Sequence, residues 1–259
     1  MNELINIVNY NKFPIDTIQF QDNCFNKIRE QSVLIFKDFI NKKCLVGIQK
    51  EASLLESKAF YCSQKHTVLL KKKNQNINDE DPLNFEVLSD KGCVPHDLID
   101  SESYLNKLYY SPIFKNFLKK VLGVENIYPY KDSLSSINYN YYQNSQQLGW
   151  HFDNASFAIT LMIQSPDTGG VFEYLDKGRD YNKNYIDKNL IKKVLENKIK
   201  CKELFVDPGT LILFYGRNYL HRVTPVTSTK SRILVTLNYN EEKDIELSEN
   251  ARLTFFGRK

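Results

Sequence analysis

The sequence predicts a mainly β protein with added helices, in which a sandwich or barrel follows a helical N-terminal region. From about residue 134 to residue 240, short apolar or alternating segments recur at regular spacing, separated by glycine- and proline-containing turns. This pattern is typical of antiparallel sandwiches and barrels. In the N-terminal region, apolar residues instead recur every three to four positions, which is the period of an amphipathic helix.

Length and composition favour one soluble domain. The chain has 259 residues, enough to bury a full core, and no repeat or Gly/Ser linker divides it. Its 35 basic and 31 acidic residues leave a net charge of +4, too weak an excess to indicate a nucleic-acid or membrane partner. The sequence leaves the oligomeric state open, a homodimer being one option.

Cysteine usage and the N-terminus favour a cytoplasmic protein. The five cysteines are widely spaced and form no CxxC motif, so we expect neither a disulfide framework nor a zinc knuckle. The first residues lack the basic and apolar regions of a signal peptide. The apolar runs are far shorter than the ~20 residues that cross a bilayer.

Residues 1–130 are expected to form a mostly helical scaffold. Helical spacing is clear over residues 1–60, and residues 66–70 are apolar and β-branched enough for a strand. Residues 101–122 predict one helix that Ser101 caps and Gly123 ends.

Residues 131–242 are expected to form the β core, and residues 243–259 a C-terminal tail. A segment rich in Lys, Asn and Asp, residues 176–201, interrupts the strands, and its second half has helical spacing. We expect a solvated insertion there, or a lid that closes on a substrate. The strands are predicted at residues 137–142, 157–163, 171–174, 210–214 and 231–240.

The chemically most informative stretch is residues 149–154. In a strand, residues i and i+2 project from the same face, so His151 and Asp153 present an imidazole and a carboxylate side by side. His221, on a later strand, can complete a facial set of two histidines and one carboxylate, the arrangement of non-haem Fe(II) oxygenases. Taken alone, a His-x-Asp pair is more often a surface turn or a satisfied core pair.

Arg232 strengthens the metal hypothesis. It lies eleven residues after His221 on an expected inward strand face, among apolar neighbours. An unpaired buried charge is costly, and no carboxylate lies close to Arg232 in the sequence. A dicarboxylate cosubstrate would supply a bidentate partner.

These motifs resemble those of the Fe(II)/2-oxoglutarate dioxygenases, in which His-x-Asp is followed by a distant His and then by an Arg. Residues 135–240 resemble, more narrowly, the free-amino-acid radical halogenases of the lysine type and their hydroxylase relatives. The segments that carry the narrower resemblance are WHFDN at 150–154, FA at 157–158, GGVFEY at 169–174, PGTL at 208–211 and NYLHRVTP at 218–225.

The resemblance implies a double-stranded β-helix, also called a jelly roll, that uses iron, 2-oxoglutarate and O2. Iron would be held by the metal ligands His151, Asp153 and His221, and 2-oxoglutarate by Arg232, with Asn138 as a further hydrogen-bonding residue. The reaction would hydroxylate an unactivated C–H bond and release succinate and CO2. Desaturation and ring closure remain open.

Asp153 separates the two branches of the family. The resemblance implies that halogenating members have Gly or Ala at this position, where chloride then binds the metal. This chain has the carboxylate, so we expect the hydroxylase branch, acting on a free L-amino acid, with lysine or another cationic amino acid as the expected substrate.

Six residues are candidate substrate contacts, and for each a structural or surface role is the alternative. Asn154 follows the metal carboxylate directly, and Thr236 and Asn238 share the expected inward face of Arg232. Asp132 could pair with a substrate ammonium. Lys65 and His66, which open an early strand, could bind a substrate carboxylate. The six are Lys65, His66, Asp132, Asn154, Thr236 and Asn238.

Two other function classes remain open. The same chemistry could act on a peptide, protein or nucleic-acid side chain, although no basic stripe interleaved with aromatic residues indicates nucleic acid. A non-enzymatic metal-binding jelly roll is the third class. Structural metal sites usually have four protein ligands, whereas three ligands and an inward arginine favour an open site.

Overall fold

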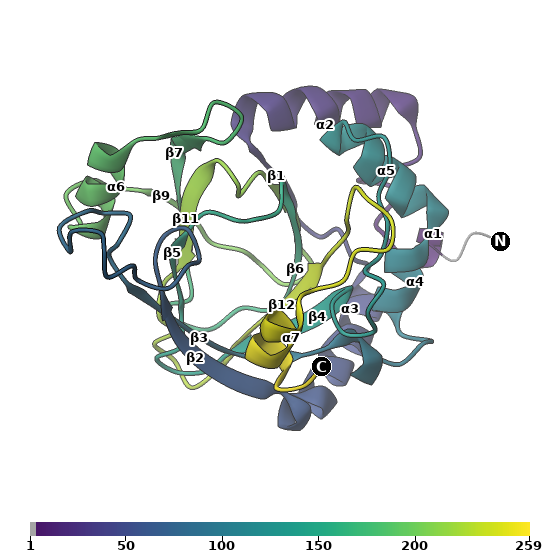
Figure 1. The fold of residues 1–259 in the computed structure, drawn as a ribbon. Helices are drawn as coiled ribbons and strands as arrows, with labels where there is room; N and C mark the ends of the chain where they lie inside the picture. The colour runs from purple at the N-terminus through teal and green to yellow at the C-terminus, as the bar shows by residue number, and fades with distance from the viewer. Residues whose placement is uncertain (1–3) are drawn as a thin grey trace.

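Two antiparallel sheets face each other in the computed structural model, which describes residues 4–259 (Figure 1). The major sheet has seven strands in the order β1-β10-β6-β12-β4-β3-β2, and the minor sheet has the order β5-β11-β7-β8, with β9 paired to β7. From β4 to β12 the chain passes repeatedly between the sheets. This topology is the expected double-stranded β-helix.

The strands of the major sheet are β1 (Val33–Phe36), β2 (Phe60–His66), β3 (Val87–Val94), β4 (Ile137–Tyr142), β6 (Ala158–Gln164), β10 (Leu211–Phe214) and β12 (Arg232–Leu237). Those of the minor sheet are β5 (Leu148–His151), β7 (Phe172–Asp180), β8 (Tyr185–Ile186), β9 (Lys202–Leu204) and β11 (Tyr219–Val223). The helices are α1 (Leu4–Ile7), α2 (Ile18–Gln31), α3 (Lys42–Leu55), α4 (Tyr104–Tyr110), α5 (Pro112–Leu122), α6 (Lys188–Leu195) and α7 (Glu249–Phe256), with short 3₁₀ turns at Glu56–Lys58 and His96–Leu98.

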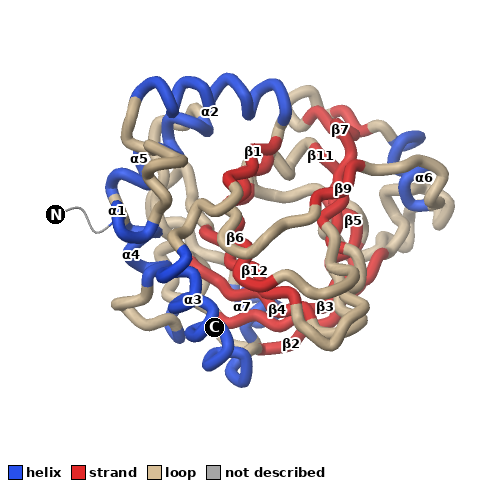
Figure 2. Tube along the Cα trace, turned by 180° about the vertical axis from the view of Figure 1, so that it is seen from behind, coloured by secondary structure: helices blue, strands red, loops and turns tan. Residues whose placement is uncertain are grey.

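Helices α1 to α5 gather on the outer side of the major sheet, away from the minor sheet (Figure 2). The main core fills the space between this helical layer and the sheet. In β4, alternate residues face opposite ways: Tyr139 and Tyr141 donate hydrogen bonds to Glu51 and to the Ala52 carbonyl of α3. The intervening residues of β4 therefore face the minor sheet.

The expectation that residues 1–130 are mostly helical is incomplete, because this region also supplies β1, β2 and β3 to the major sheet. Of the strand expected at residues 66–70, only His66 lies in a strand, as the last residue of β2. Leu70 N–H donates to the Thr67 carbonyl with Leu70 at φ 56°, which closes a turn.

The helix expected at residues 101–122 is two helices. Pro112 cannot continue α4, since it lacks the N–H that an interior helical position donates. Ser111 caps α5 by accepting from Phe114 N–H, and Ser103, rather than Ser101, caps α4. Gly123 ends α5 at φ 70°, as expected.

The insertion 176–201 lies against the outer face of the minor sheet. Ile191 and Val194 of α6 pack in one cluster with Trp150 and Phe152, the residues that alternate with His151 and Asp153. None of the segment lines the cavity between the sheets. The structure therefore gives the insertion a covering role, and the lid hypothesis has no support from its position.

The C-terminal tail, residues 243–259, contains α7, which packs on β2 and β3. Phe256 is buried against Cys93 and Leu134, and Arg258 forms a two-point ion pair with Asp97 at 2.6 and 2.8 Å. Within residues 4–259, no helix has both the length and the apolar character needed to span a membrane.

Replacing Phe114 by alanine should lower the free energy of unfolding by about 3–5 kcal/mol, the usual cost of deleting a buried phenyl ring. Phe114 is fully buried and packs near Phe39 and Phe117, with ring centroids 6.1 and 6.4 Å away. Urea denaturation measures the change. Phe205→Ala is the matched control, since Phe205 is 68% exposed. Equal effects of the two substitutions would contradict this account of the core.

Candidate metal and cosubstrate site

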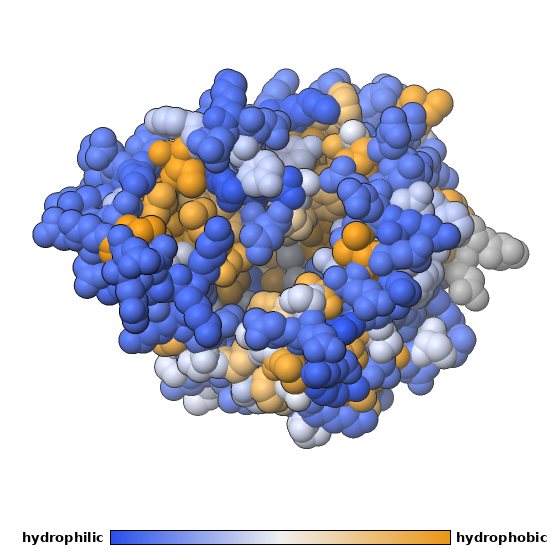
Figure 3. Space-filling model, in the orientation of Figure 1, coloured by the Kyte–Doolittle hydropathy of each residue, from blue (hydrophilic) through white to orange (hydrophobic). Residues whose placement is uncertain are grey.

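A cavity of about 260 Å³ lies between the two sheets. Figure 3 shows one face of the molecule hollowed near its centre, with apolar surface inside a hydrophilic rim. The lining residues come from both sheets, from α7 and from loops that contain Leu70, Asp153 and Val206. They include the two histidines and the aspartate of the motif, Arg232, and several apolar side chains.

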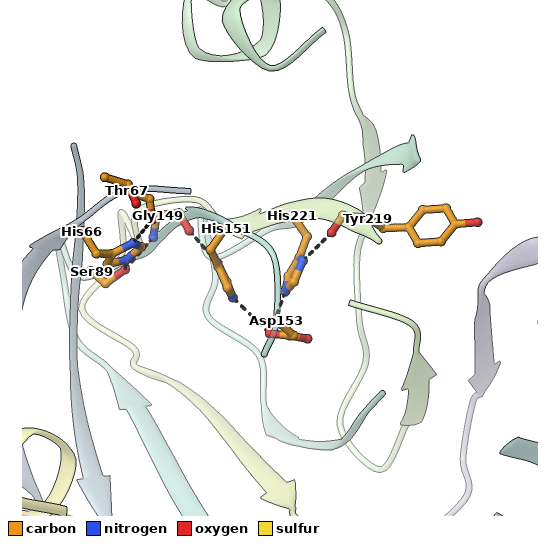
Figure 4. Close-up of polar contacts among 8 residues, drawn as sticks. All are labelled: His66, Thr67, Ser89, Gly149, His151, Asp153, Tyr219 and His221. Atoms are coloured by element: carbon orange, nitrogen blue, oxygen red, sulfur yellow. Dashed lines mark hydrogen bonds and ion pairs between the residues drawn. The ribbon is translucent and has the colours of Figure 1, made fainter. Parts of the chain in front are cut away.

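His151, Asp153 and His221 converge in this cavity (Figure 4). The pairing of β11 with β5 sets His221 opposite His151, and their ring centroids are 4.1 Å apart. Asp153 Oδ1 lies 3.4 Å from His151 Nε2 and 3.5 Å from His221 Nε2. One potential ligand atom from each residue falls within 4.8 Å of the others.

Backbone carbonyls fix how both imidazoles are presented. The Nδ1 atom of His151 lies 2.8 Å from the Gly149 carbonyl, and Nδ1 of His221 lies 2.8 Å from the Tyr219 carbonyl. A carbonyl only accepts, so each Nδ1 carries a proton, and Nε2, the atom turned toward Asp153, is left as the possible metal ligand of each ring. Burial, together with His221, lowers the pKa of His151, which favours the neutral imidazole that binds a metal.

Asp153 contributes a charged oxygen ligand. Burial acts against the carboxylate, but His221 and His151, when protonated at Nε2, hold the pKa of Asp153 well below its usual value, and a bound cation would act in the same direction. Its Oδ2 atom is buried and has no hydrogen-bond partner among residues 4–259. Buried polar atoms normally have partners. Two nitrogen lone pairs and an unsatisfied carboxylate facing one point fit a divalent metal with open positions.

Gly216 makes room for the carboxylate. Its carbonyl accepts the Asp153 N–H at 3.1 Å, and a Cβ at Gly216 would overlap Asp153 Oδ2. A glycine is therefore required at this turn because another group occupies the position of a side chain.

His66 and Ser89 brace the strand that carries His151 (Figure 4). Gly149 N–H donates to Ser89 Oγ at 2.9 Å, and Ser89 Oγ lies 2.5 Å from His66 Nε2. His66 Nδ1 is 2.8 Å from the Thr67 carbonyl. His66 lines the cavity, as a substrate contact would, but both ring nitrogens are engaged. Through Ser89, His66 helps to hold Gly149 in place, and the Gly149 carbonyl in turn orients His151.

Arg232 lies at the start of β12, on the cavity wall, and is 2% exposed. Its guanidinium stacks 5.2 Å from the centre of the Tyr142 ring. The Nε and Nη1 atoms have no hydrogen-bond partner within the described chain. Burial lowers the pKa of Arg232, yet a guanidinium stays charged at neutral pH. Two unpartnered donors on a buried cation fit a carboxylate ligand.

Asn138 and Asn238 do not line the cavity. Asn238 Nδ2 donates to Asn138 Oδ1 at 3.0 Å and to the Ser135 carbonyl, and Asn138 Nδ2 donates to the Leu134 and Ile137 carbonyls. These bonds tie the strand ends to the loop before β4. The geometry gives both asparagines a structural role instead of the expected contacts with 2-oxoglutarate or substrate.

Three further candidates also lie outside the cavity. The Asp132 carboxylate accepts from Leu134 N–H, Ser135 Oγ and Leu247 N–H, which joins its loop to the C-terminal segment. Lys65 is exposed on β2, and Asn154 is exposed after Asp153. These positions correct the expectation of substrate contacts. Thr236 does line the cavity.

Sequence reasoning missed Lys91, Asn140 and Phe255, which also line the cavity. Asn140 follows Asn138 on the same face of β4, so the alternation of the strand was the available signal. Lys91 and Phe255 had no comparable signal, because β3 and α7 were not expected.

Gly216→Ala should displace the Asp153 carboxylate and lower the affinity for Fe(II), with the fold retained. Metal titration and thermal unfolding measure the two properties. The control is the same substitution in an Asp153→Gly background, where no carboxylate remains to be displaced and no further loss is expected. A loss of similar size in both backgrounds would contradict the proposed contact.

The sequence matches the family model described as Halogenase D (HalD) over residues 19–254. No curated protein is similar enough to be matched. Among solved structures, the chain is similar to an oxidoreductase of the 2OG-Fe(II) oxygenase family from Burkholderia pseudomallei. The identity is 12% and the TM-score 0.55, over 87% of this chain and 93% of that one.

Two other solved structures are similar. A prolyl hydroxylase from Trichoplax adhaerens, in complex with a peptide of hypoxia inducible factor, has 12% identity and a TM-score of 0.58, over 91% of this chain and 94% of that one. The epimerase SnoN, in complex with Fe3+, alpha ketoglutarate and nogalamycin RO, has 8% identity and a TM-score of 0.56, over 86% and 84%. The family match covers most of the chain, and the neighbours share its double-stranded β-helix. The chain therefore belongs to the Halogenase D family.

Proposed function

We propose that the protein hydroxylates an unactivated C–H bond of a free L-amino acid and forms succinate and CO2. The observation that carries the proposal is the Asp153 carboxylate, which lies between the Nε2 atoms of His151 and His221. The family is named for halogenation. In this chain, however, a protein carboxylate takes the position that a halide ligand needs. Oxygen insertion is therefore favoured over halide insertion.

The proposed roles of the residues follow from their geometry. His151 and His221 would hold the iron through Nε2, and Asp153 would hold it through a carboxylate oxygen. When bound, iron and 2-oxoglutarate would supply the activation of O2 that C–H hydroxylation needs. Arg232 would bind a carboxylate of 2-oxoglutarate through the two donors that lack partners.

The cavity walls around these residues are largely apolar. Phe172, Phe214, Val223 and Leu234 line the space next to the histidines. Apolar walls exclude bulk water, which strengthens the interaction of Arg232 with a carboxylate and limits side reactions. The size of the cavity, about 260 Å³, favours a small molecule as substrate. The sequence resemblance taken alone favours lysine among the amino acids, whereas the charges of the cavity lining, described below, favour an amino acid without a cationic side chain.

The purified protein should form succinate from 2-oxoglutarate and Fe(II) only when a suitable free amino acid is added, and mass spectrometry should show a gain of one oxygen atom, even with chloride present. His151→Ala should abolish turnover, and Asp153→Gly should lose hydroxylation. The proposal is wrong if the product is chlorinated, if only peptides stimulate turnover, or if Asp153→Gly hydroxylates as well as the parent.

A further inference from the structure

The charges that line the cavity are unbalanced. Its cationic side chains are Lys91 and Arg232, and Asp153 is the one carboxylate of the described lining. Asp153 is already engaged with the two imidazoles. No other acidic side chain of residues 4–259 lines the cavity to pair with an ammonium group on a substrate's side chain. The cavity therefore suits ligands that bring negative charge.

Lys91 is the cation of the lining to which the proposed function gives no role. It projects from β3 into the cavity, and its Nζ donates to Asn140 Oδ1 at 2.5 Å. Within residues 4–259, no carboxylate is among the groups that act on the charge of Lys91. A desolvated cation without a counter-ion is costly, which indicates a position prepared for an anion.

Asn140 holds the ammonium of Lys91 in place. Its Nδ2 donates to the Asn138 carbonyl at 3.2 Å and the Leu234 carbonyl at 3.4 Å, so the amide is oriented with Oδ1 toward Lys91. An ammonium has three donors. The bond to Asn140 uses one, and the other two can serve a ligand in the cavity.

Lys91 remains charged in this environment. Burial and the nearby Arg232 disfavour its ammonium, but Tyr142, Cys93 and Cys62 act against these effects, and the pKa of Lys91 is raised above its ordinary value.

The two cations lie on different strands, β3 and β12, on either side of β4. Arg232 offers two unpartnered donors, Nε and Nη1, which match the two oxygens of one carboxylate. The other carboxylate of 2-oxoglutarate belongs at the metal under the proposed function. A further carboxylate at Lys91 would therefore come from the substrate.

We propose that Lys91 binds a carboxylate of the substrate and that the rest of the substrate carries no positively charged side chain. This inference rests on the proposed function and names its substrate class, an aliphatic or aromatic amino acid. Leu70, Leu148, Leu234 and Phe255 offer an apolar surface to its side chain. The α-ammonium is balanced by the α-carboxylate of the same zwitterion, so it does not need an acidic side chain in the lining, whereas an ammonium on the side chain would.

The test compares Lys91→Met with Arg232→Met. Fe(II) and 2-oxoglutarate, mixed with the enzyme without oxygen, give a visible absorption band that reports 2-oxoglutarate binding. Lys91→Met should leave this affinity within about twofold and raise the KM of the accepted amino acid about 10- to 100-fold, the usual effect of losing a hydrogen bond to a charged group. Arg232→Met should weaken the 2-oxoglutarate band instead.

Two variants control for folding and charge. Lys65→Met removes a lysine that is exposed on the neighbouring strand β2 and should change neither value. Lys91→Arg keeps the cation and should recover part of the loss in KM. The proposal is overturned if Lys91→Met weakens 2-oxoglutarate binding as Arg232→Met does, or if lysine or arginine is a better substrate than leucine and phenylalanine.

Failure of the proposed function gives a different result. In that case the wild-type protein shows neither the absorption band nor succinate. Calorimetry with leucine and phenylalanine then tests Lys91 alone. Binding that Lys91→Met abolishes supports the carboxylate site. Equal binding by both proteins, or no binding to the wild type, overturns it.

Discussion

The site depends on the register between β5 and β11, which sets His221 opposite His151 and brings the Asp153 carboxylate between them. Carbonyls of the same two strands accept hydrogen bonds from the Nδ1 atoms of the two histidines. Both Nε2 atoms therefore face inward. The result is a buried cluster of metal-binding atoms with an unsatisfied oxygen. Without a cation such a cluster is unfavourable, because desolvated polar atoms have lost their partners. The rest of the fold holds this register in place.

Alternation along strands accounts for what the sequence could predict. Because successive residues of a strand face opposite sides, His151 and Asp153 could be assigned to one face, and Arg232 to the inward face of its strand. The same rule does not predict whether a residue lies at the end of its strand or beside the cavity. Asn138 and Asn140 share a face, yet Asn138 lies at the strand end and binds loop carbonyls, whereas Asn140 reaches the cavity.

The remaining differences arise from contacts between distant parts of the chain. Lys91 lies in the cavity because β3 pairs with β4 and extends the major sheet, and nothing near Lys91 in the sequence indicates this pairing. The apolar face of α6 could be recognised, but not its partner. That partner is the outer face of the minor sheet, where Trp150 and Phe152 need cover because they alternate with the metal-site residues.

We propose that Asp153, with the two histidines, binds the iron that performs the chemistry. The most direct test is a crystal structure of the protein with Fe(II) and 2-oxoglutarate, grown without oxygen and with chloride present. We predict His151 Nε2, His221 Nε2 and an Asp153 oxygen on one side of the metal, with the distal carboxylate of 2-oxoglutarate on Arg232. Iron held by the two histidines alone, with chloride bound and the Asp153 carboxylate turned away, would contradict the account.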